Sequence, residues 1–416
     1  MSTVSFTGLL IVSVIAVIAP IAARSIKPVK VPSPVVEIVA GIIVGPSLLG
    51  WVKIDQPINT IALLGLAFLL FLAGLEIDLR GTMASELRAP LIAFAGSLIL
   101  GLCAGAAFHA VGWVRNPLFL AITLASTSLG LVLPVLQDAG LTKTDLGKLV
   151  IVGATAGELG AITLLTLFFS ETKGGTAGKI VTLGIFVGVV TAIGLTLGRV
   201  GRSTRLETLL TRLQDTTAEI RVRIAVALLL CFVALAAKVG LQTILGAFLA
   251  GMVLNLVDRD TESHPIFRQK LAALGYGFMV PVFFVSSGVE FDLSALTRSP
   301  AALARIPLFL LALLIVRAAP AALYARTVGW RGAIVAGFLQ ATSLPVIVTA
   351  AAIGVAIRVV APVTGSALVA AGMLSVLIFP VIALGLTRTD RTQTQLVRRE
   401  ETNPRLSTPS PGPQVT

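Results

Sequence analysis

Glu158 is a carboxylate in the middle of an apolar run, LVIVGATAGELGAITLLTLFF. An ionisable group at the centre of a bilayer costs at least about 2.5–3.5 kcal/mol on insertion scales, so such a residue marks a candidate functional site. Its neighbours are small, among them Gly157 and Gly160, and small residues leave room for water, an ion or a close helix. A carboxylate in a low-dielectric cavity binds a proton more tightly, whereas a nearby cation weakens that binding. We therefore expect Glu158 to bind either a proton or a monovalent cation at any one time.

Arg317 lies far from either end of another apolar run, IPLFLLALLIVRAAPAALYA. A guanidinium stays charged at any relevant pH, so Arg317 is predicted to compensate the charge of a buried carboxylate. That carboxylate is either Glu158 or Glu37, which lies near the end of its own apolar segment. The alternative is a structural Glu158–Arg317 pair without a transport role, although buried pairs are weak sources of stability.

The tripeptide Thr-Ser-Leu occurs twice within apolar runs, at 127–129 and at 342–344, and each copy has helix-breaking residues nearby. Freed backbone groups at membrane depth are tolerated only where they are buried or line a cavity. The hydroxyls predicted to bind the ion together with Glu158 are Thr127 and Ser128. The residues predicted to form a crossing of two broken helices are Gly130, Thr342, Ser343 and Pro345. Alternatively, these hydroxyls only form hydrogen bonds between packed helices.

The composition places these residues in a membrane protein. Of 416 residues, 56% are hydrophobic and 12% are charged, whereas a soluble domain has about 25% charged residues. A soluble enzyme and a disordered chain are therefore excluded. A span requires about 20 mainly apolar residues. Thirteen candidate spans follow, at 5–23, 35–52, 58–77, 88–113, 117–137, 146–170, 178–198, 221–238, 241–257, 271–290, 299–325, 331–354 and 360–387.

The net charge of +12 is explained by topology. With the N-terminus outside, 23 Lys and Arg residues fall on the inner side and 8 on the outer side, which is the positive-inside pattern. We expect a multi-pass protein of the bacterial inner membrane, with its C-terminus in the cytoplasm, membrane lipid around it and no nucleic-acid partner. Cys103 and Cys231 lie in apolar stretches without ligand-spaced partners, so we expect two buried structural thiols and neither a metal site nor a cofactor.

Three stretches recur, two of them at nearly the same separation. LAGLEIDL at 72–79 resembles SSGVEFDL at 286–293, STSLGLV at 126–132 resembles ATSLPVI at 341–347, and EIVAGIIVG at 37–45 more weakly resembles TILGAFLAG at 243–251. Each pair is seven predicted spans apart, which indicates an inverted repeat, as in many secondary transporters. Four parts are predicted: a first repeat at 1–171, a seventh span with a linker helix at 172–223, a second repeat at 224–387 and a disordered tail at 388–416.

Four stretches resemble the monovalent cation:proton antiporter family, in the branch of Kef-type potassium efflux systems and bacterial Na⁺/H⁺ exchangers. They are VVEIVAGIIVGPSLLG (35–50), LGLAFLLFLAGLEIDL (64–79), LASTSLGLVLPVLQDAG (124–140) and HPIFRQKLAALGYGFMVPVFFVSSGVEFDL (264–293). The resemblance implies an all-helical, thirteen-span inverted repeat with two crossed broken helices, elevator-type alternating access and a homodimer. The family's ion-carrying carboxylate then matches Glu158, its basic residue in the eleventh span matches Arg317, and Gly157 stands where the family has Asp, Asn or Gln.

The predicted function is therefore exchange of Na⁺ or K⁺ for protons, without a catalytic residue or enzymatic activity. One titrating carboxylate implies electroneutral exchange. The alternatives are a sodium-coupled organic-solute symporter or a cation channel on a related scaffold. Carboxylate and hydroxyl oxygens suit Na⁺ and K⁺ alike, so the sequence does not select between these cations.

Overall fold

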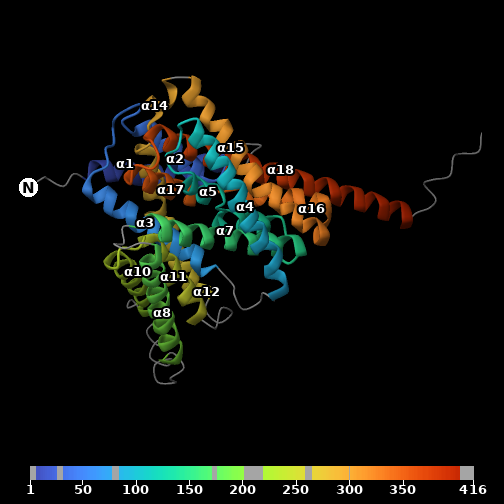
Figure 1. Ribbon diagram of the computed structural model, residues 1–416, viewed down its shortest axis with the longest axis horizontal. Helices are drawn as coiled ribbons and strands as arrows, with labels where there is room; N and C mark the ends of the chain where they lie inside the picture. Colours follow the sequence, from blue (N-terminus) through green and yellow to red (C-terminus); the bar gives the residue numbers. More distant parts are fainter. Residues whose placement is uncertain are drawn as a thin grey trace, which may run out of the picture.

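The computed structural model describes residues 6–25, 31–76, 84–170, 176–200, 219–257, 265–298 and 300–402, which are helical apart from turns and one isolated bridge between Val114 and Val360 (Figure 1). The elements are α1 (Thr7–Ser25), α2 (Ser33–Val44), α3 (Gln56–Leu75), α4 (Ala84–Ala110), α5 (Pro117–Leu124), α6 (Leu129–Asp138), α7 (Asp145–Phe169), α8 (Thr176–Val200), α10 (Ile220–Lys238), α11 (Thr243–Val257), α12 (Pro265–Leu274), the π-helical turn η1 (Gly275–Met279), α13 (Val280–Val289), α14 (Leu293–Thr297), α15 (Pro300–Ala321), the 3-10 turn η2 (Ala322–Tyr324), α16 (Ala325–Gln340), α17 (Pro345–Ala356) and α18 (Pro362–Thr402).

Nine of the described helical segments are long and apolar enough to cross a membrane, and one of them, Pro300–Gln340, is 41 residues long. Four shorter apolar helices, at Thr7–Ala23, Ser33–Val44, Thr243–Val257 and Pro345–Ala356, fall on the predicted first, second and ninth spans and on the second half of the twelfth. The protein is thus a multi-pass membrane protein, and its helices follow the predicted segments. The total of thirteen spans stays a prediction.

Side-chain caps explain several helix starts near the ends of the spans. The Asp55 carboxylate accepts from Ile58 N at 3.0 Å, the Asn116 side chain accepts from Phe119 N at 3.1 Å, and the Thr144 hydroxyl accepts from Gly147 N at 3.1 Å. These residues satisfy N–H groups that a helix start leaves without a partner. Residues of the type expected at N-caps therefore fix where α3, α5 and α7 begin.

Glycines allow two pairs of helices to pack with their backbones in contact. α2 lies on α13, where a Cβ on Gly41 would stand 2.2 Å from Val285 O and one on Gly288 would stand 2.1 Å from Ile38 O. α11 lies on α3, where a Cβ on Gly251 would stand 2.0 Å from Phe71 O. Small residues of this kind allow close packing of spans, because lipid supplies no hydrophobic force between helices.

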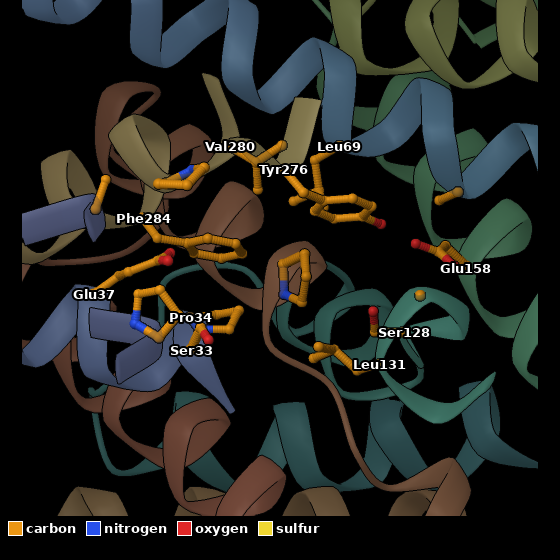
Figure 2. A pocket seen from close by; sticks show the side chains of 16 residues that line it. Ser33, Pro34, Glu37, Leu69, Ser128, Leu131, Glu158, Tyr276, Val280 and Phe284 are labelled. Carbon is orange, nitrogen blue, oxygen red and sulfur yellow. The ribbon is translucent and has the colours of Figure 1, made fainter. Parts of the chain in front are cut away.

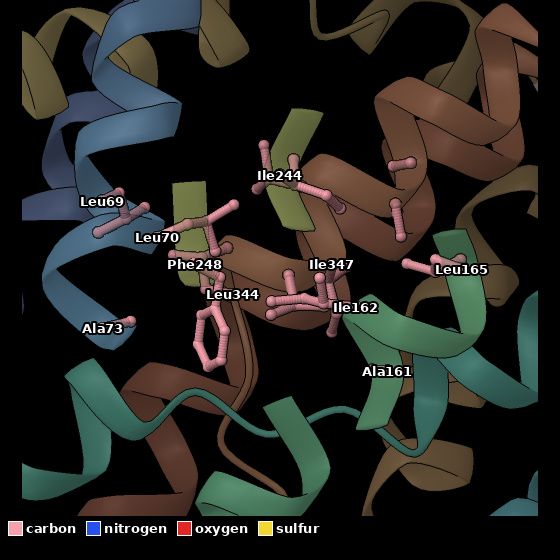
Figure 3. Packing of buried hydrophobic residues seen from close by; sticks show 14 of the residues in the cluster. Leu69, Leu70, Ala73, Ala161, Ile162, Leu165, Ile244, Phe248, Leu344 and Ile347 are labelled. Carbon is pink, nitrogen blue, oxygen red and sulfur yellow. The ribbon is translucent and has the colours of Figure 1, made fainter. Parts of the chain in front are cut away.

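An apolar core joins these pairs to the remaining spans. Figure 3 shows Leu69 of α3, Phe248 of α11, Ile162 of α7, Ile347 of α17 and Leu344, the residue before α17, gathered in one cluster. All five side chains are less than a tenth exposed. The cluster connects α7, which carries Glu158, to the segment that precedes α17.

Some sequence-based expectations fall outside or differ from this structure. Most of the linker helix at 202–223 lies outside the described residues, apart from the start of α10. α18 continues as helix to Thr402, into the segment predicted to be a disordered tail. The buried thiols are a wrong prediction, since Cys103 and Cys231 are both exposed. Their helices turn these faces outward, where the surrounding lipid is itself apolar, so a small hydrophobic side chain is tolerated. The division into four parts stays a prediction.

We predict that Gly41→Val lowers the unfolding temperature of the detergent-purified protein by several degrees. Its side chain would meet the α13 backbone, and overpacking of this kind costs about 1–3 kcal/mol. Gly184→Val on α8 is the control, since no atom lies within 4 Å of its Cβ position. Thermal unfolding monitored by size-exclusion chromatography measures both variants, and equal losses would contradict the assigned α2–α13 contact.

Candidate functional site

The two Thr-Ser-Leu segments interrupt their spans and meet at one point. Residues between α5 and α6 and between α16 and α17 are non-helical, and Ser128 N donates to Thr342 O at 3.2 Å. The Thr127 hydroxyl donates to Gln340 O at 2.6 Å, and the Ser126 and Ser343 hydroxyls lie 3.0 Å apart. All the residues predicted for the crossing except Gly130 and Pro345 belong to these breaks; Gly130 lies in the first turn of α6, and Pro345 begins α17.

The Glu158 carboxylate faces the N-terminus of α6. Its Oε2 atom accepts a hydrogen bond from Leu129 N at 3.0 Å, and the side chain is 2% exposed. A helix N-terminus carries a partial positive charge and N–H groups without intrahelical partners. The break in the fifth predicted span therefore supplies the buried carboxylate with both a donor and a favourable field.

A cavity of about 250 Å³ reaches Glu158 (Figure 2). Ser128 and Gly130 line it beside Glu158, while Glu37 and Ser33 line its other end, and Tyr276 and Phe284 lie between these two groups. Glu37 is 4% exposed. The cavity thus connects two carboxylates from α2 and α7, and only Glu158 lies at the crossing.

Tyr276 reaches this cavity from a π-helical turn. Gly275–Met279 interrupts the helix between α12 and α13, and such turns are often found at functional sites. A Cβ on Gly65 of α3 would stand 2.0 Å from Met279 O, so the absent side chain lets the turn pack against α3. Figure 2 shows the Tyr276 hydroxyl directed towards Glu158.

Arg317 is 1% exposed and binds neutral oxygens. It donates to Ser97 Oγ at 3.2 Å, to Gly153 O at 3.3 Å, and to both Gln340 O and Gln340 Oε1 at 3.4 Å. None of these partners is Glu158 or Glu37, so the direct ion pair that the sequence suggested is replaced by a link between α4, α7 and α16. Its predicted charge compensation would act on Glu158 through space.

Two glycines on one face of α7 accommodate this link. A Cβ on Gly153 would stand 2.1 Å from Gln340 Nε2, and one on Gly157 would stand 3.0 Å from Arg317 Nη2. The Gln340 amide also donates to the Tyr324 hydroxyl at 2.9 Å. Gly157, which replaces a polar residue of the family motif, therefore stands where the guanidinium lies close to the α7 backbone.

The structure brings most of the predicted site residues close together. Some of them line the cavity, and others lie inside the crossing. Ser128, Gly130, Pro345, Glu37 and Glu158 line the cavity, whereas Thr127 and Ser343 bond within the crossing. Glu37 has no contact with Arg317 among the described hydrogen bonds. Its position follows from the packing of α2 on α13, which turns it towards the cavity.

Sequence reasoning missed Gln340 and Tyr276. Gln340 is a polar residue in an apolar run, two positions before the second Thr-Ser-Leu, and Tyr276 stands between two glycines in LGYGF. Both signals were available. The role of Gln340 depends on its contact with Arg317 of α15, and the direction of Tyr276 depends on the π-helical turn. The sequence pattern shows neither of them.

A family model matches most of the chain. The model for the sodium/hydrogen exchanger transmembrane region matches residues 13–385, and the chain belongs to this family of cation:proton antiporters. Members of the family are transporters and not enzymes.

Individual relatives support the same assignment. YjbQ of Bacillus subtilis (strain 168), a protein named for Na⁺/H⁺ antiport, is 30% identical over 92% of this chain and 63% of YjbQ. GerN of Bacillus cereus, named a Na⁺/H⁺-K⁺ antiporter, is 27% identical over 62% of this chain and 65% of GerN. The aligned regions thus span slightly less than two thirds of these relatives. The structure of the sodium proton antiporter MjNhaP1 from Methanocaldococcus jannaschii at pH 8 has a TM-score of 0.61 and 16% identity, covering 91% of this chain and 95% of that chain, which shows a common fold.

We predict that Arg317→Lys and Arg317→Met separate the two contributions of this residue. Lysine retains the charge but cannot reproduce the fork of donors, so both variants should unfold at lower temperature than the wild type. Only methionine removes a positive charge near Glu158, which favours the protonated carboxylate and should shift cation-driven proton release by about one pH unit towards higher pH. Exchange rates across a pH series in everted vesicles measure the shift. An unshifted profile for Arg317→Met would exclude an electrostatic action on Glu158.

Proposed function

We propose that this protein exchanges Na⁺ or K⁺ for protons, with both ions competing for Glu158. The observation that carries the proposal is a buried carboxylate at the end of a cavity, beside the crossing of two interrupted spans. A proton and a metal cation both bind the same oxygens, so one ion must leave before the other binds. The family membership and the names of YjbQ and GerN support this activity.

Ser128 is the hydroxyl best placed to complete the cation site. It lines the cavity beside Glu158, whereas the Thr127 hydroxyl already donates to Gln340 O and is buried within the crossing. The carbonyls of Gln340, Thr342 and Ser343 accept hydrogen bonds from protein donors. The proposed ligands are therefore a carboxylate oxygen of Glu158, the Ser128 hydroxyl and water, a set of hard oxygen ligands that suits a small cation.

Electroneutral exchange is consistent with the charges around Glu158. One carboxylate lies at the crossing, and Arg317 remains positive. When Glu158 binds a proton or a monovalent cation, the total charge of the pair is the same. Glu37 lies at the far end of the cavity (Figure 2). It can therefore attract ions into the cavity without changing the total charge of Glu158 and Arg317.

Alternating access would require the crossing to move relative to the helices that face it. The α2–α13 and α3–α11 contacts join the first and second halves of the chain, which supports the predicted inverted repeat. We propose an elevator-type movement within a homodimer in the bacterial inner membrane, with the N-terminus outside and the C-terminus in the cytoplasm. The physiological role would be pH and cation homeostasis.

We predict that Glu158→Gln abolishes cation-dependent proton movement. Glutamine retains the shape of the side chain but carries no exchangeable charge. Glu158→Asp should retain exchange with a rate reduced about 10-fold or more, because a shorter side chain misplaces the ligand by about 1 Å. The assay is a pH dye in proteoliposomes, with Na⁺, K⁺ and Li⁺ titrated separately and the membrane potential clamped.

Several results would contradict the proposal. Full exchange by Glu158→Gln would remove this residue as the carrier. Cation flux that is not coupled to protons would indicate a channel, and sodium-driven uptake of a labelled organic solute would indicate a symporter. A rate that changes with the clamped membrane potential would argue against electroneutral exchange.

A further inference from the structure

A second cavity, of about 470 Å³, lies at the opposite ends of the helices that line the first cavity. On α3 the first cavity contacts Leu69 and Ala73, whereas the second contacts Asn59 and Leu66. On α17 the first contacts Pro345, and the second contacts positions from Val348 to Ala356. The two cavities therefore face opposite sides of the membrane.

A thin apolar barrier separates the cavities. Phe284 lines the first cavity and Phe283 lines the second. These neighbouring rings lie 5.2 Å apart, centroid to centroid. These two rings are therefore part of the barrier between the second cavity and the cavity that contains Glu158.

Ser286 places a buried hydroxyl at the wall of the second cavity. The residue is 5% exposed, and its Oγ atom has no hydrogen-bond partner within the described part of the chain. A buried polar group left without a partner is energetically unfavourable. A water or ion that enters the cavity is one way to supply the missing partner.

Glu290 lies on the same helical face, four residues after Ser286, and its side chain also lines the cavity. Side chains four positions apart point to the same side of a helix. The neighbouring polar groups are engaged elsewhere: the Asp292 carboxylate accepts from Ala295 N and the Ser294 hydroxyl, and the Ser287 hydroxyl donates to Phe283 O. Ser286 and Glu290 thus share one face of α13 and both line the cavity.

The repeated motif relates Glu290 to Glu76. Each follows the last residue of its span, as the C-cap of α13 and of α3 respectively. Glu76 follows Ala73, which lines the first cavity, by three residues at the end of α3. The corresponding residues of the two motifs thus place one carboxylate near each cavity.

We propose that Glu290 and Ser286 form a second binding site for a hydrated monovalent cation, on the side of the barrier opposite Glu158. One carboxylate balances a single positive charge, and the cavity has room for several waters, each of which occupies about 30 Å³. The other lining residues are mostly apolar, such as Leu63 and Val369, and Glu290 itself is exposed, so a cation bound there keeps part of its water shell. This site would load cations for the exchange proposed above, on which its transport role rests.

Glu290→Gln and Ser286→Ala test the site in oriented proteoliposomes, with cation affinity measured separately from each side at fixed pH. From the Glu290 side, Glu290→Gln should raise the apparent KM about 5- to 10-fold and Ser286→Ala about 2- to 3-fold. The KM from the other side and the maximal rate should change little. Asp292→Asn is the matched control, because asparagine also caps a helix, and it should match the wild type. Unchanged affinity, or equal changes from both sides, would overturn the proposal.

A binding measurement separates this proposal from the antiport proposal. Purified Glu158→Gln should retain saturable binding of radioactive Na⁺, and adding Glu290→Gln should remove it. If the wild type showed no exchange but this residual binding persisted, the second site would stand and the antiport proposal would fail. If exchange occurred but Glu158→Gln bound no Na⁺ at any concentration below 1 M (a binding free energy of about zero in the standard state), the second site would be refuted alone.

Discussion

The two interrupted spans leave backbone groups without helical partners inside the protein, and the hydrogen bonds that satisfy these groups organise the structure. Ser128 N donates to Thr342 O, and Leu129 N donates to the Glu158 carboxylate. An unsatisfied buried group costs about 1–3 kcal/mol, so the start of α6 depends on Glu158. An ion that binds Glu158 would therefore act directly on a helix end. The proposed transport site and the broken helix are parts of one arrangement.

Close backbone packing gives this arrangement a rigid surround. Gly41 and Gly288 join α2 to α13, and Gly251 joins α11 to α3. Backbones at such distances cannot shift separately without losing their contacts, because packed interiors contain few voids. The two cavities follow the opposite ends of α3 and α13. Any change of access would then move these helices as groups, because their backbones are in contact.

Arg317 combines an electrostatic role with a structural one. Its guanidinium binds Ser97, the Gly153 carbonyl and Gln340, and Gln340 O also accepts from Thr127 in the crossing. A lysine would offer a single point charge at this place, whereas the planar fork of arginine can hold several acceptors. The positive charge is thus held beside Gly157, the neighbour of Glu158 on α7, by neutral partners, and Gly157 leaves the space that this geometry needs.

The sequence by itself determined the class of the protein and the approximate course of its spans, and it pointed to Glu158 as the candidate carboxylate. The length of apolar runs indicates the spans, and the distribution of Lys and Arg indicates their orientation. A single carboxylate within an apolar run, such as Glu158, indicates a functional site, because a charge inside a bilayer is costly. Only the tertiary structure decided which groups meet. Packing between helices far apart in the sequence sets the partners of Arg317 and the place of Glu37 in a cavity. It also sets the surroundings of the π-helical turn at Tyr276 and leaves the Ser286 hydroxyl without a hydrogen-bond partner in the described part of the chain. Apolar periodicity shows which segments cross a membrane, but backbone contacts at glycines and the bonds of broken helices set how those segments face one another.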